Sequence, residues 1–373
     1  MQEPQPTKLA ARGAGSLLGR TWSPRGGSLS TDSLESLLLS LIAIAVAALI
    51  FGAFLALQGH DPLAVYRTLY LGAFGTRFSL ESTLTQAAPL LLTALCTLIP
   101  ARVGLLVIGG EGAVVLGGLG AALAGVGLAG AADLLGTVLT LAAGALAGGL
   151  WIGAAGALKH FRGVNETIST LLLNYIAIAL LNHLVSGPIR DYSQTLKAQS
   201  WSIPKAFMIG NMPGWSVHWG LLIGLVGCVI LNVLLRHTTL GFAMDVLGGN
   251  RRAAQMAGLP LGRLILLATF LGGAAAGLAG AVEVVAVHGA ASESLVVGLG
   301  YAGILVAFLA RQNALAVIGV ALLLGGISAS GGLLQRRFDI PHAATTVLQG
   351  LIFLCVLASG TFAGRLLPRR SAQ

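Results

Sequence analysis

Charged side chains are scarce in this sequence. Asp, Glu, Lys and Arg make up 9% of its 373 residues, while hydrophobic residues make up 55%. Soluble globular chains carry roughly 25% charged residues, so this chain has too few polar side chains to cover a folded surface in water. The scarcity excludes an ordinary soluble protein, and the mean hydropathy of +0.86 predicts a protein embedded in a membrane.

Cysteines and catalytic motifs are also few. Cys96, Cys228 and Cys355 each lie alone in an apolar run, a spacing that excludes a zinc site or a disulfide framework. The motifs HExxH, GxSxG and GxxxxGKS/T do not occur. We therefore expect no catalytic residue, no metal site and no cofactor in this chain. The net charge is +9, but no basic stripe with interleaved aromatics accompanies it, so nucleic-acid binding is not expected.

The sequence does contain a series of apolar runs. A segment that crosses lipid must satisfy its own backbone, so each run is expected to be a helix, and about 20 residues suffice to span the bilayer. The sequence predicts an all-α fold, a polytopic transmembrane helical bundle of about ten spans. The runs 297–310 and 313–330 are short, and form either two full spans or a broken or re-entrant pair. The predicted spans are 37–57, 82–100, 105–128, 132–157, 167–186, 216–235, 263–287, 297–310, 313–330 and 342–362.

Charge placement predicts the orientation of these spans. With the N-terminus inside, 15 of the 22 Lys and Arg residues lie in inner segments and 7 in outer ones, which agrees with the positive-inside rule. Both termini are therefore expected in the cytoplasm, and Arg336 and Arg337 fit this arrangement worst. The predicted parts are a disordered cytoplasmic tail (1–33), a transmembrane domain (34–364) with a cytoplasmic loop at 237–262, and a basic cytoplasmic tail (365–373).

Three carboxylates fall in the predicted spans, where an ionisable group is costly and is a functional candidate. Glu111 lies among glycines, which indicate either a broken helix that opens its backbone to a cavity or a structural carboxylate paired to a neighbouring helix. Glu283 precedes His288, and this pair either lines an outer vestibule or ends a helix in solvent. Glu166 begins a span directly after Asn165, where a negative charge also caps the helix.

A polar stripe runs along the span that Glu166 begins. Glu166, Thr170 and Asn174 are spaced four residues apart, and they drift by only about 40° per step around a helix. They therefore share one face, which either lines a pathway or joins helices. Elsewhere, the glycine pairs Gly144/Gly148 and Gly273/Gly277 predict close approach of helix backbones.

Four stretches carry a family resemblance. They are ARVGLLVIGGEGAVVLGG (101–118), GVNETISTLLLNYIA (163–177), LGFAMDVLGGNRRAAQMAGLP (240–260), and GYAGILVAFLARQNALAVI (300–318) with VLQGLIFLCVLAS (347–359). Together they resemble the permease subunits of the branched-chain amino acid, ribose and nucleoside ABC importers. The stretch 163–177 points to the nucleoside branch, which works with a basic-membrane-protein lipoprotein.

The resemblance implies a transport subunit that forms the pathway for nucleosides by alternating access, without an ATPase site of its own. The implied partners are a cytoplasmic ABC ATPase that uses ATP, a paralogous companion permease, an extracytoplasmic substrate-binding lipoprotein, and the lipid bilayer of the bacterial inner membrane. The implied substrate-pathway residues are Gly110, Glu111, Gly112, Asn165, Glu166, Thr170 and Asn174. The implied residues of the ATPase-coupling loop at 237–262 are Gly241, Gly249, Asn250, Arg251, Ala253, Ala254 and Gly258.

The sequence departs from the family pattern at three positions. Val107 and Ala113 stand where the family has Asn and Gln, and Asp245 stands where it usually has Arg. The alternative functions are an ion-coupled secondary transporter that uses Glu111, Glu166 or Glu283, a permease for a sugar or a branched-chain amino acid, and a structural membrane subunit of another complex. The coupling loop separates the first of these from an ABC permease, since a secondary transporter has no ATPase to dock.

Overall fold

The computed structural model describes residues 31–193 and 197–366. The predicted tails, 1–33 and 365–373, lie outside these ranges except for the residues that begin the first helix and end the last. The described residues form helices and three isolated β-bridges, so the predicted all-α class is confirmed.

The helices follow one another with short connections, apart from the segment between α6 and α7. They are α1 (Thr31–Leu57), α2 (Pro62–Phe74), α3 (Arg77–Arg102), α4 (Gly110–Gly127), α5 (Asp133–Arg162), α6 (Glu166–Ser186), the short η1 (Lys205–Phe207), α7 (Gly220–His237), α8 (Thr239–Gly249), α9 (Arg251–Met256), α10 (Leu261–Glu283), the π-helical turn η2 (Val284–His288), η3 (Glu293–Leu295), α11 (Leu299–Leu309), α12 (Ala316–Phe338) and α13 (Ala343–Leu366).

Seven of the described helices are long and apolar enough to cross a membrane, and a bent pair makes up to eight. The seven are α3, α4, α5, α6, α7, α10 with η2, and α12, while the pair joins α1 to α2 at 120°. The predicted count of about ten is therefore not confirmed. The other two predicted spans, 297–310 and 342–362, fall on the shorter apolar helices Glu293–Leu309 and Ala343–Ser359.

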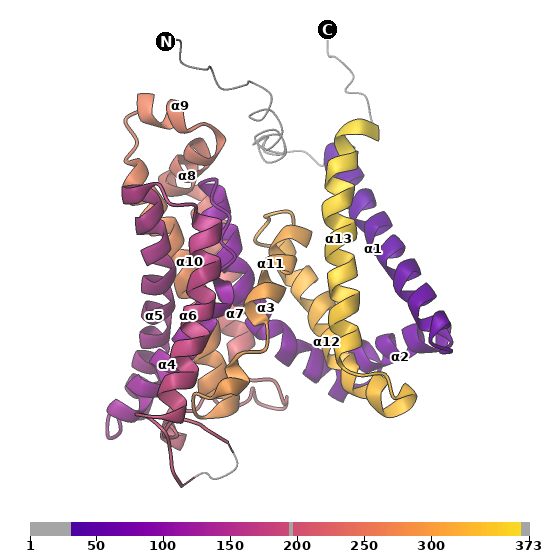
Figure 1. The fold of residues 1–373 in the computed structure, drawn as a ribbon, viewed down its shortest axis with the longest axis horizontal. Coiled ribbons are helices and arrows are strands. Elements are labelled where there is room, and N and C mark those ends of the chain that lie inside the picture. Colours follow the sequence, from indigo (N-terminus) through magenta and orange to yellow (C-terminus); the bar gives the residue numbers. More distant parts are fainter. Residues whose placement is uncertain (1–30, 194–196, 367–373) are drawn as a thin grey trace, which may run out of the picture.

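Helix α3 forms the centre of the bundle. It packs against α7, α10, α11 and α12, and 78% of its most apolar stretch is buried, against 33% in α5, α6 and α7. Figure 1 shows α5, α6 and α10 on one side of the molecule, α1, α2, α12 and α13 on the other, and α11 between them. Helices α5, α6 and α7 therefore turn most of their apolar side chains outward, as helices in contact with lipid do.

The two ends of the molecule differ. The start of α1 and the end of α13 lie at the same end as α8 and α9, and α1 runs to the opposite end, where α2 lies across the molecule (Figure 1). The predicted placement of both chain ends in the cytoplasm stays a prediction, since residues 1–30 and 367–373 lie outside the described ranges.

Helix α2 was not expected from the sequence, which places a loop between 58 and 81. Asp61 caps its start, because the Asp61 Oδ1 atom accepts a hydrogen bond of 3.0 Å from the Leu63 amide. Pro62 then occupies the first helical position, where its missing N–H costs nothing. One face of α2 is buried, mainly against α12. The buried residues are Val65, Thr68, Leu69, Gly72 and Ala73.

The glycine pairs predicted to bring helices together do so between α5 and α10. A Cβ atom on Gly148 would lie 2.5 Å from the Gly273 carbonyl oxygen, and one on Gly144 would lie 2.6 Å from the Gly117 carbonyl oxygen of α4. Real Cβ atoms do not approach so closely. The backbones of α4, α5 and α10 therefore meet through glycine, and this contact fixes the position at which α4 enters the bundle.

Candidate functional site

The candidate site is built around a break in the chain between α3 and α4. Residues 103–109 form no helix, and α4 begins only at Gly110. Leu105 and Val107 of this segment are buried, so its backbone passes through the apolar interior. Each backbone N–H or C=O group left without a hydrogen bond there costs on the order of several kcal/mol. The segment therefore needs hydrogen-bond partners from elsewhere in the fold.

The polar stripe of α6 supplies these partners. The Thr167 hydroxyl donates to the Leu106 carbonyl oxygen at 3.1 Å. The Thr170 hydroxyl oxygen accepts from the Ile108 amide at 3.2 Å, and the Asn174 Nδ2 group donates to the Ile108 carbonyl oxygen at 3.3 Å. The sequence leaves two roles open for the stripe, lining a pathway or joining helices. These hydrogen bonds join α6 to the segment that leads into α4.

Asn174 also caps α4. Its Oδ1 atom accepts from the Gly112 amide at 2.6 Å, one of the first amides of α4, which have no partner within their own helix. The side chain of Asn174 is fully buried. A cap normally comes from the residue that precedes a helix, whereas here it comes from the middle of a neighbouring helix 62 residues later in the sequence.

Glu111 repeats this arrangement one helix further on. It is fully buried, and its two carboxylate oxygens accept from the amides of Gly298 at 2.8 Å and Gly300 at 2.6 Å. These amides belong to the start of α11, where a negative charge is favourable. Helix α11 has 11 residues and is therefore about 16 Å long, roughly half the hydrocarbon thickness. Glu111 is thus paired to a neighbouring helix, as one of the two sequence interpretations has it.

We call the side chains of Glu111, Thr167, Thr170 and Asn174 the cap network. It links α6 to α4 and α4 to α11 through their first turns. Glycine allows the contact, because a Cβ atom on Gly112 would lie 2.8 Å from Asn174 Oδ1 and one on Gly300 would overlap the Glu111 backbone. The network therefore holds two helix starts against each other inside the bundle.

One residue connects the cap network to an accessible surface. Asn174 Nδ2 lies 3.2 Å from the hydroxyl oxygen of Tyr301, and Tyr301 is 42% exposed. Every other residue of α11 is buried or partly buried. The Tyr301 ring is therefore the part of α11 that the surroundings can reach, and its hydroxyl is held by a buried side chain.

The structure brings together five of the seven predicted pathway residues: Gly110, Glu111, Gly112, Thr170 and Asn174. The other two lie at the start of α6. Asn165 caps that helix, since its Oδ1 atom accepts from the amides of Thr167 at 2.9 Å and Ile168 at 3.2 Å. Glu166 pairs with Lys159 at 2.8 Å. Whether any of the seven contacts a transported molecule stays a prediction.

Glu283 lies at the other end of the bundle, where α10 passes into η2. Its carboxylate is 3.7 Å from the His288 Nε2 atom, and its side chain is only 14% exposed. The pair is therefore largely enclosed, which differs from the solvated helix end that the sequence also allows. The enclosure arises because the segment before α7 folds back over this end, with Ser200 and Ile203 donating backbone hydrogen bonds to Ala291 and Gly289.

The loop at 237–262 folds into α8 and α9, which project from one end of the bundle (Figure 1). The Thr238 hydroxyl oxygen caps α8 by accepting from the Gly241 amide at 3.2 Å. The Asn250 Oδ1 atom caps α9 by accepting from Arg252 at 2.9 Å and Ala253 at 3.2 Å. The predicted short helical loop is therefore present, with a polar cap at the start of each helix.

The predicted coupling residues divide into an exposed and a buried group. Gly249, Asn250, Arg251 and Gly258 are exposed, and Gly258 has a positive φ of 71° that ends α9. Gly241 and Ala254 are buried, and Ala253 is partly buried. Ala254 joins the apolar core with Met244 and Leu247, so it anchors the loop, while the exposed group is available to a partner.

Arg102 connects this loop to the rest of the bundle. Its guanidinium lies 3.5 Å from the Asp245 carboxylate of α8 and donates to the Gln312 carbonyl oxygen, between α11 and α12, at 3.0 Å. Burial raises the pKa of the Asp245 carboxyl, and Arg102 lowers it by less. Asp245, where the family usually has Arg, thus faces inward to an arginine of α3.

The other two departures from the family pattern are apolar contacts. Val107 and Ala113 are buried, and both belong to a cluster with Cys96, Val114 and Ile152. Both side chains pack within that cluster and offer no polar group to a ligand.

Several residues of the site were not singled out in the sequence. Thr167 lies between Glu166 and Thr170, and its helical spacing to Thr170 was a visible signal. Arg102 and Tyr301 had none, because their partners lie 143 and 127 residues away. Met256 is 84% exposed at the tip of α9, and an apolar residue in a polar loop was a signal for a contact surface.

A multi-pass helical bundle in which two helices start inside the fold, with their first turns capped by buried side chains, has the architecture of membrane transport proteins. Residues 79–357 match the family described as branched-chain amino acid transport system / permease component. The chain belongs to this family of permeases.

Individual relatives support the same family. The chain is 31% identical to the guanosine ABC transporter permease protein NupP of Bacillus subtilis over 330 residues, and these cover 87% of this chain and 94% of that protein. It is 29% identical to the glucose ABC transporter permease protein TsgB13 of Haloferax volcanii, over 86% of this chain and 87% of that protein. It is 27% identical to the guanosine ABC transporter permease protein NupQ of Bacillus subtilis, over 76% and 91%.

Proposed function

We propose that this chain forms the translocation pathway of an ABC importer for nucleosides in the bacterial inner membrane. A separate ATPase supplies the energy, an extracytoplasmic lipoprotein delivers the substrate, and a paralogous permease forms the other half of the pathway. This chain binds no ATP and no other cofactor. The proposal places it among subunits that move a substrate without changing it.

The observation that carries the proposal is the capped, projecting loop of α8 and α9 in a chain of the permease family. The loop exposes Gly249, Asn250, Arg251 and Met256, while its core residue Ala254 is anchored to the bundle. A loop of this kind suits docking to a soluble subunit. Docking to a cytoplasmic ATPase supports the orientation that we propose, with α8, α9 and both chain ends in the cytoplasm.

The proposed pathway runs beside the cap network. Its reachable side chain is Tyr301, whose hydroxyl is fixed by Asn174. Tyr301 lies in the first turn of α11, which meets the first turn of α4 through Glu111, so a movement of α11 relative to α4 displaces the ring. The ring is aromatic, and a nucleobase stacks favourably on such a ring. The buried polar side chains of the cap network hold the Tyr301 ring in position at the wall of the pathway.

The relatives favour nucleosides, with sugars second. NupP and NupQ are named for guanosine and TsgB13 for glucose. A pair of guanosine permeases within one organism also supports a paralogous companion for this chain. A nucleoside contains a sugar and a base, so a sugar permease is the second candidate, and substrate competition distinguishes the two.

The ion-coupled alternative finds no support in the site. Both oxygens of Glu111 accept backbone hydrogen bonds, Glu166 is paired with Lys159, and Glu283 faces His288. Each carboxylate in the described part of the chain that was considered for ion coupling therefore already has a partner.

The test is reconstituted uptake. The full chain, its companion, the ATPase and the lipoprotein are placed in vesicles, and uptake of labelled guanosine is measured with and without ATP. We expect uptake that requires ATP hydrolysis and is competed by other nucleosides but not by glucose. Uptake of labelled glucose in the same vesicles, without uptake of guanosine, would establish the sugar candidate. Uptake that follows a proton gradient without the ATPase would refute the proposal.

A matched pair of variants tests the docking loop in the same vesicles. Gly249→Asp adds a charge to the exposed group at the end of α8 and is expected to abolish ATP-driven uptake while the chain still inserts. Gly210→Asp adds the same charge to an exposed glycine beyond α6, where a Cβ atom meets nothing within 4 Å, and is expected to leave uptake unchanged. Equal loss in both variants would show that the effect is not specific to the loop.

A further inference from the structure

The exposed face of α2 has the composition of a helix that lies in the headgroup region of a bilayer. Leu63, Tyr70 and Phe74 are 79%, 65% and 43% exposed, and Arg67 is exposed beside them. Helix α2 turns 120° away from α1, so it does not continue across the membrane. Amphipathic helices of this kind place apolar and aromatic side chains toward the acyl chains and arginine toward the phosphates.

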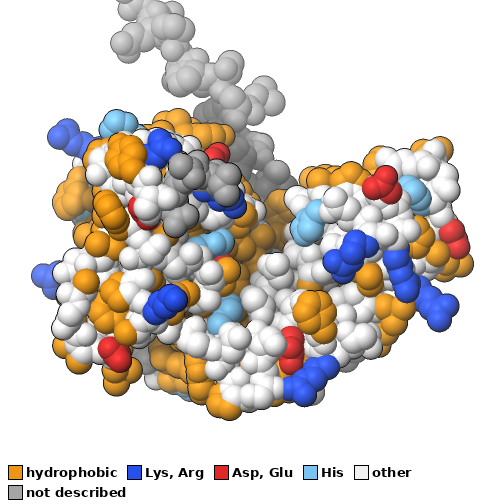
Figure 2. Space-filling view, turned by 90° about the horizontal axis from the view of Figure 1, so that it is seen from below, with side chains coloured by type: hydrophobic (Ala, Val, Ile, Leu, Met, Phe, Trp, Pro, Cys, Tyr) orange, Lys and Arg blue, Asp and Glu red, His pale blue; other side chains and the backbone are white. Residues whose placement is uncertain are grey.

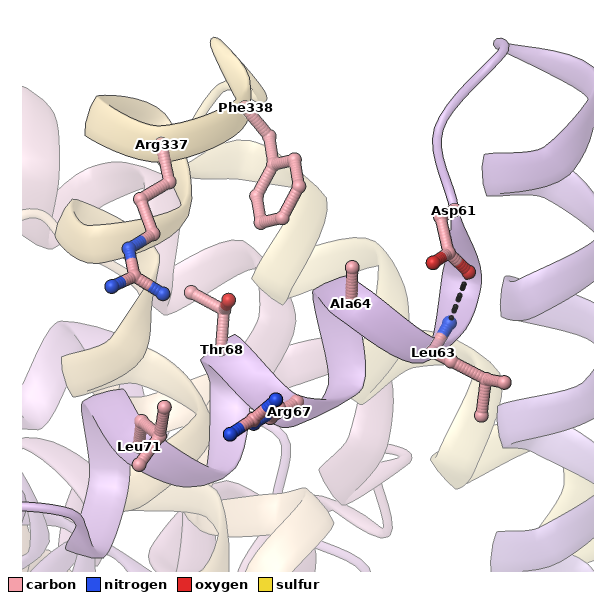
Figure 3. A pocket seen from close by; sticks show the side chains of 8 residues that line it. All are labelled: Asp61, Leu63, Ala64, Arg67, Thr68, Leu71, Arg337 and Phe338. Carbon is pink, nitrogen blue, oxygen red and sulfur yellow. Dashed lines mark hydrogen bonds between the residues drawn. The ribbon is translucent and has the colours of Figure 1, made fainter.

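A hollow of about 570 Å³ lies between this helix and the end of α12. Its lining includes Arg67 and Thr68 of α2 together with Arg337 and Phe338 of α12. Figure 3 shows Arg337 extending from α12 toward α2 with Thr68 beside it, while Arg67 lies on the near face of α2 and Leu63 further along the same helix. The hollow therefore combines two guanidinium groups and a hydroxyl at one end with apolar side chains at its margin.

The two arginines of the hollow, Arg67 and Arg337, are not ion-paired with any carboxylate of the described residues. The acidic residue of the lining, Asp61, uses its Oδ1 atom to cap α2. Figure 2, which views this end of the molecule, shows basic side chains gathered on the part formed by α2 and the end of α12.

This cluster runs against the usual distribution of charge. Arg67, Arg336 and Arg337 are at the end opposite α8 and α9, where positive side chains are normally few. Arginine there needs a compensating interaction, and the guanidinium fork matches the oxygens of a phosphate group. Its place beside an interfacial helix makes a lipid phosphate the group most readily supplied.

We propose that Arg67, Thr68 and Arg337 bind the phosphate of an anionic phospholipid. The two arginines pair with the phosphate oxygens, the Thr68 hydroxyl donates to the same group, and the acyl chains lie along Leu63 and Phe338. The bound lipid holds α2 against the end of α12. This inference does not depend on the proposed substrate, and its test measures lipid rather than uptake.

The experiment compares lipid retention in purified full-length chain. Native mass spectrometry counts the phosphatidylglycerol and phosphatidylcholine molecules that remain bound to the wild type, to the double variant Arg67→Gln/Arg337→Gln and to Arg336→Gln. The last is the matched control, because it removes the same charge one residue away, from an exposed arginine that does not line the hollow. The single variants Arg67→Gln and Arg337→Gln stand in if the double variant does not fold.

We expect the wild type and Arg336→Gln to retain phosphatidylglycerol in preference to phosphatidylcholine, and the double variant to bind it about tenfold to thirtyfold more weakly, since each basic residue strengthens binding about fivefold. Equal weakening in Arg336→Gln would show a general charge effect and overturn the site. Displacement of the lipid by millimolar inorganic phosphate would assign the hollow to free phosphate. Unchanged lipid retention in the double variant, combined with loss of lipoprotein binding, would assign it to an acidic protein surface.

Discussion

Replacement of Asn174 by leucine is the most direct test of the cap network. Asparagine and leucine branch at the same carbon, so Asn174→Leu keeps the outline of the side chain and removes its hydrogen bonds, while the larger methyl groups of leucine add crowding against α4. The Gly112 amide then loses its acceptor and the Ile108 carbonyl oxygen loses its Asn174 donor. Both groups belong to backbone that is held in place by the surrounding glycine contacts, so neither can turn to a new partner.

The expected cost follows from these two groups. A buried polar group left without a partner costs about 1–3 kcal/mol, while hydrogen bonds between membrane helices contribute about 0.6 kcal/mol on average. The lower value applies where the unfolded helices find other partners within the bilayer. Ile108 lies in an unwound segment and Gly112 at a helix start, so the higher scale applies to both groups, and we expect a loss of about 2–6 kcal/mol in the free energy of unfolding.

The assay is reversible unfolding of the purified chain in mixed micelles, compared with Asn182→Leu. Asn182 lies on the same helix, eight residues further on, and is exposed, so its replacement makes the same chemical change without touching α4. The wild type and Asn182→Leu should unfold at similar denaturant concentrations, and Asn174→Leu at a lower one. If Asn174→Leu is no less stable than Asn182→Leu, the cap network does not stabilise the start of α4, and the interpretation of the site is wrong.

Three further outcomes follow from the same contacts. Glu111→Gln places an amide nitrogen against one of two backbone N–H groups, so we expect a loss of about 1–3 kcal/mol in stability, measured by the same unfolding assay, with the exposed Glu293→Gln as an unaffected control. Gly300→Ala pushes a methyl group into the backbone of α4 and should lower the free energy of unfolding by about 1–3 kcal/mol. Gly110→Ala should be tolerated, because its Cβ atom would lie 3.5 Å from Gly300 Cα. Equal effects of the two variants would contradict the close approach of α4 and α11. Because the pKa of the Asp245 carboxyl is raised in the folded chain, the folded chain binds a proton there more readily than the unfolded chain does. The free energy of unfolding should therefore increase as the pH falls from neutral toward the ordinary pKa of 3.8. Asp245→Asn should flatten that part of a profile of stability against pH, and an unchanged profile would contradict the assignment.

The parts of the site that the sequence predicted are those with a local signal. Thr170 and Asn174 repeat with the period of a helix, and an amide in the middle of an apolar span has to meet a partner. The choice between lining a pathway and joining helices depended on the partner, which is the unwound segment before α4. A break in a helix leaves little trace in composition, because Leu105 and Val107 are as apolar as the helices on either side.

The missed parts depended on distant contacts or on length. Glu111 was a candidate, but its partner was missed, because Gly298 lies 187 residues later in the sequence and no local pattern joins the two. Helix α2 has only 13 residues, too few for a span, and Arg67 interrupts its apolar character. The signal that was available is Asp61 followed by Pro62, a combination that starts helices, with apolar residues at helical spacing after it.

The caps that α6 lends to α4 have a consequence for the biogenesis of this protein. Helix α4 leaves the ribosome before α6, so at that stage the first turn of α4 lacks its acceptor from Asn174, and Ile108 lacks its partners from Thr170 and Asn174. The start of α11 depends in turn on Glu111, made nearly two hundred residues earlier. The starts of α4 and α11 therefore cannot reach their final depth one at a time in order of synthesis. Nascent chains that stop before residue 174 should leave α4 accessible to water-soluble thiol reagents at an engineered cysteine, and longer ones should protect it.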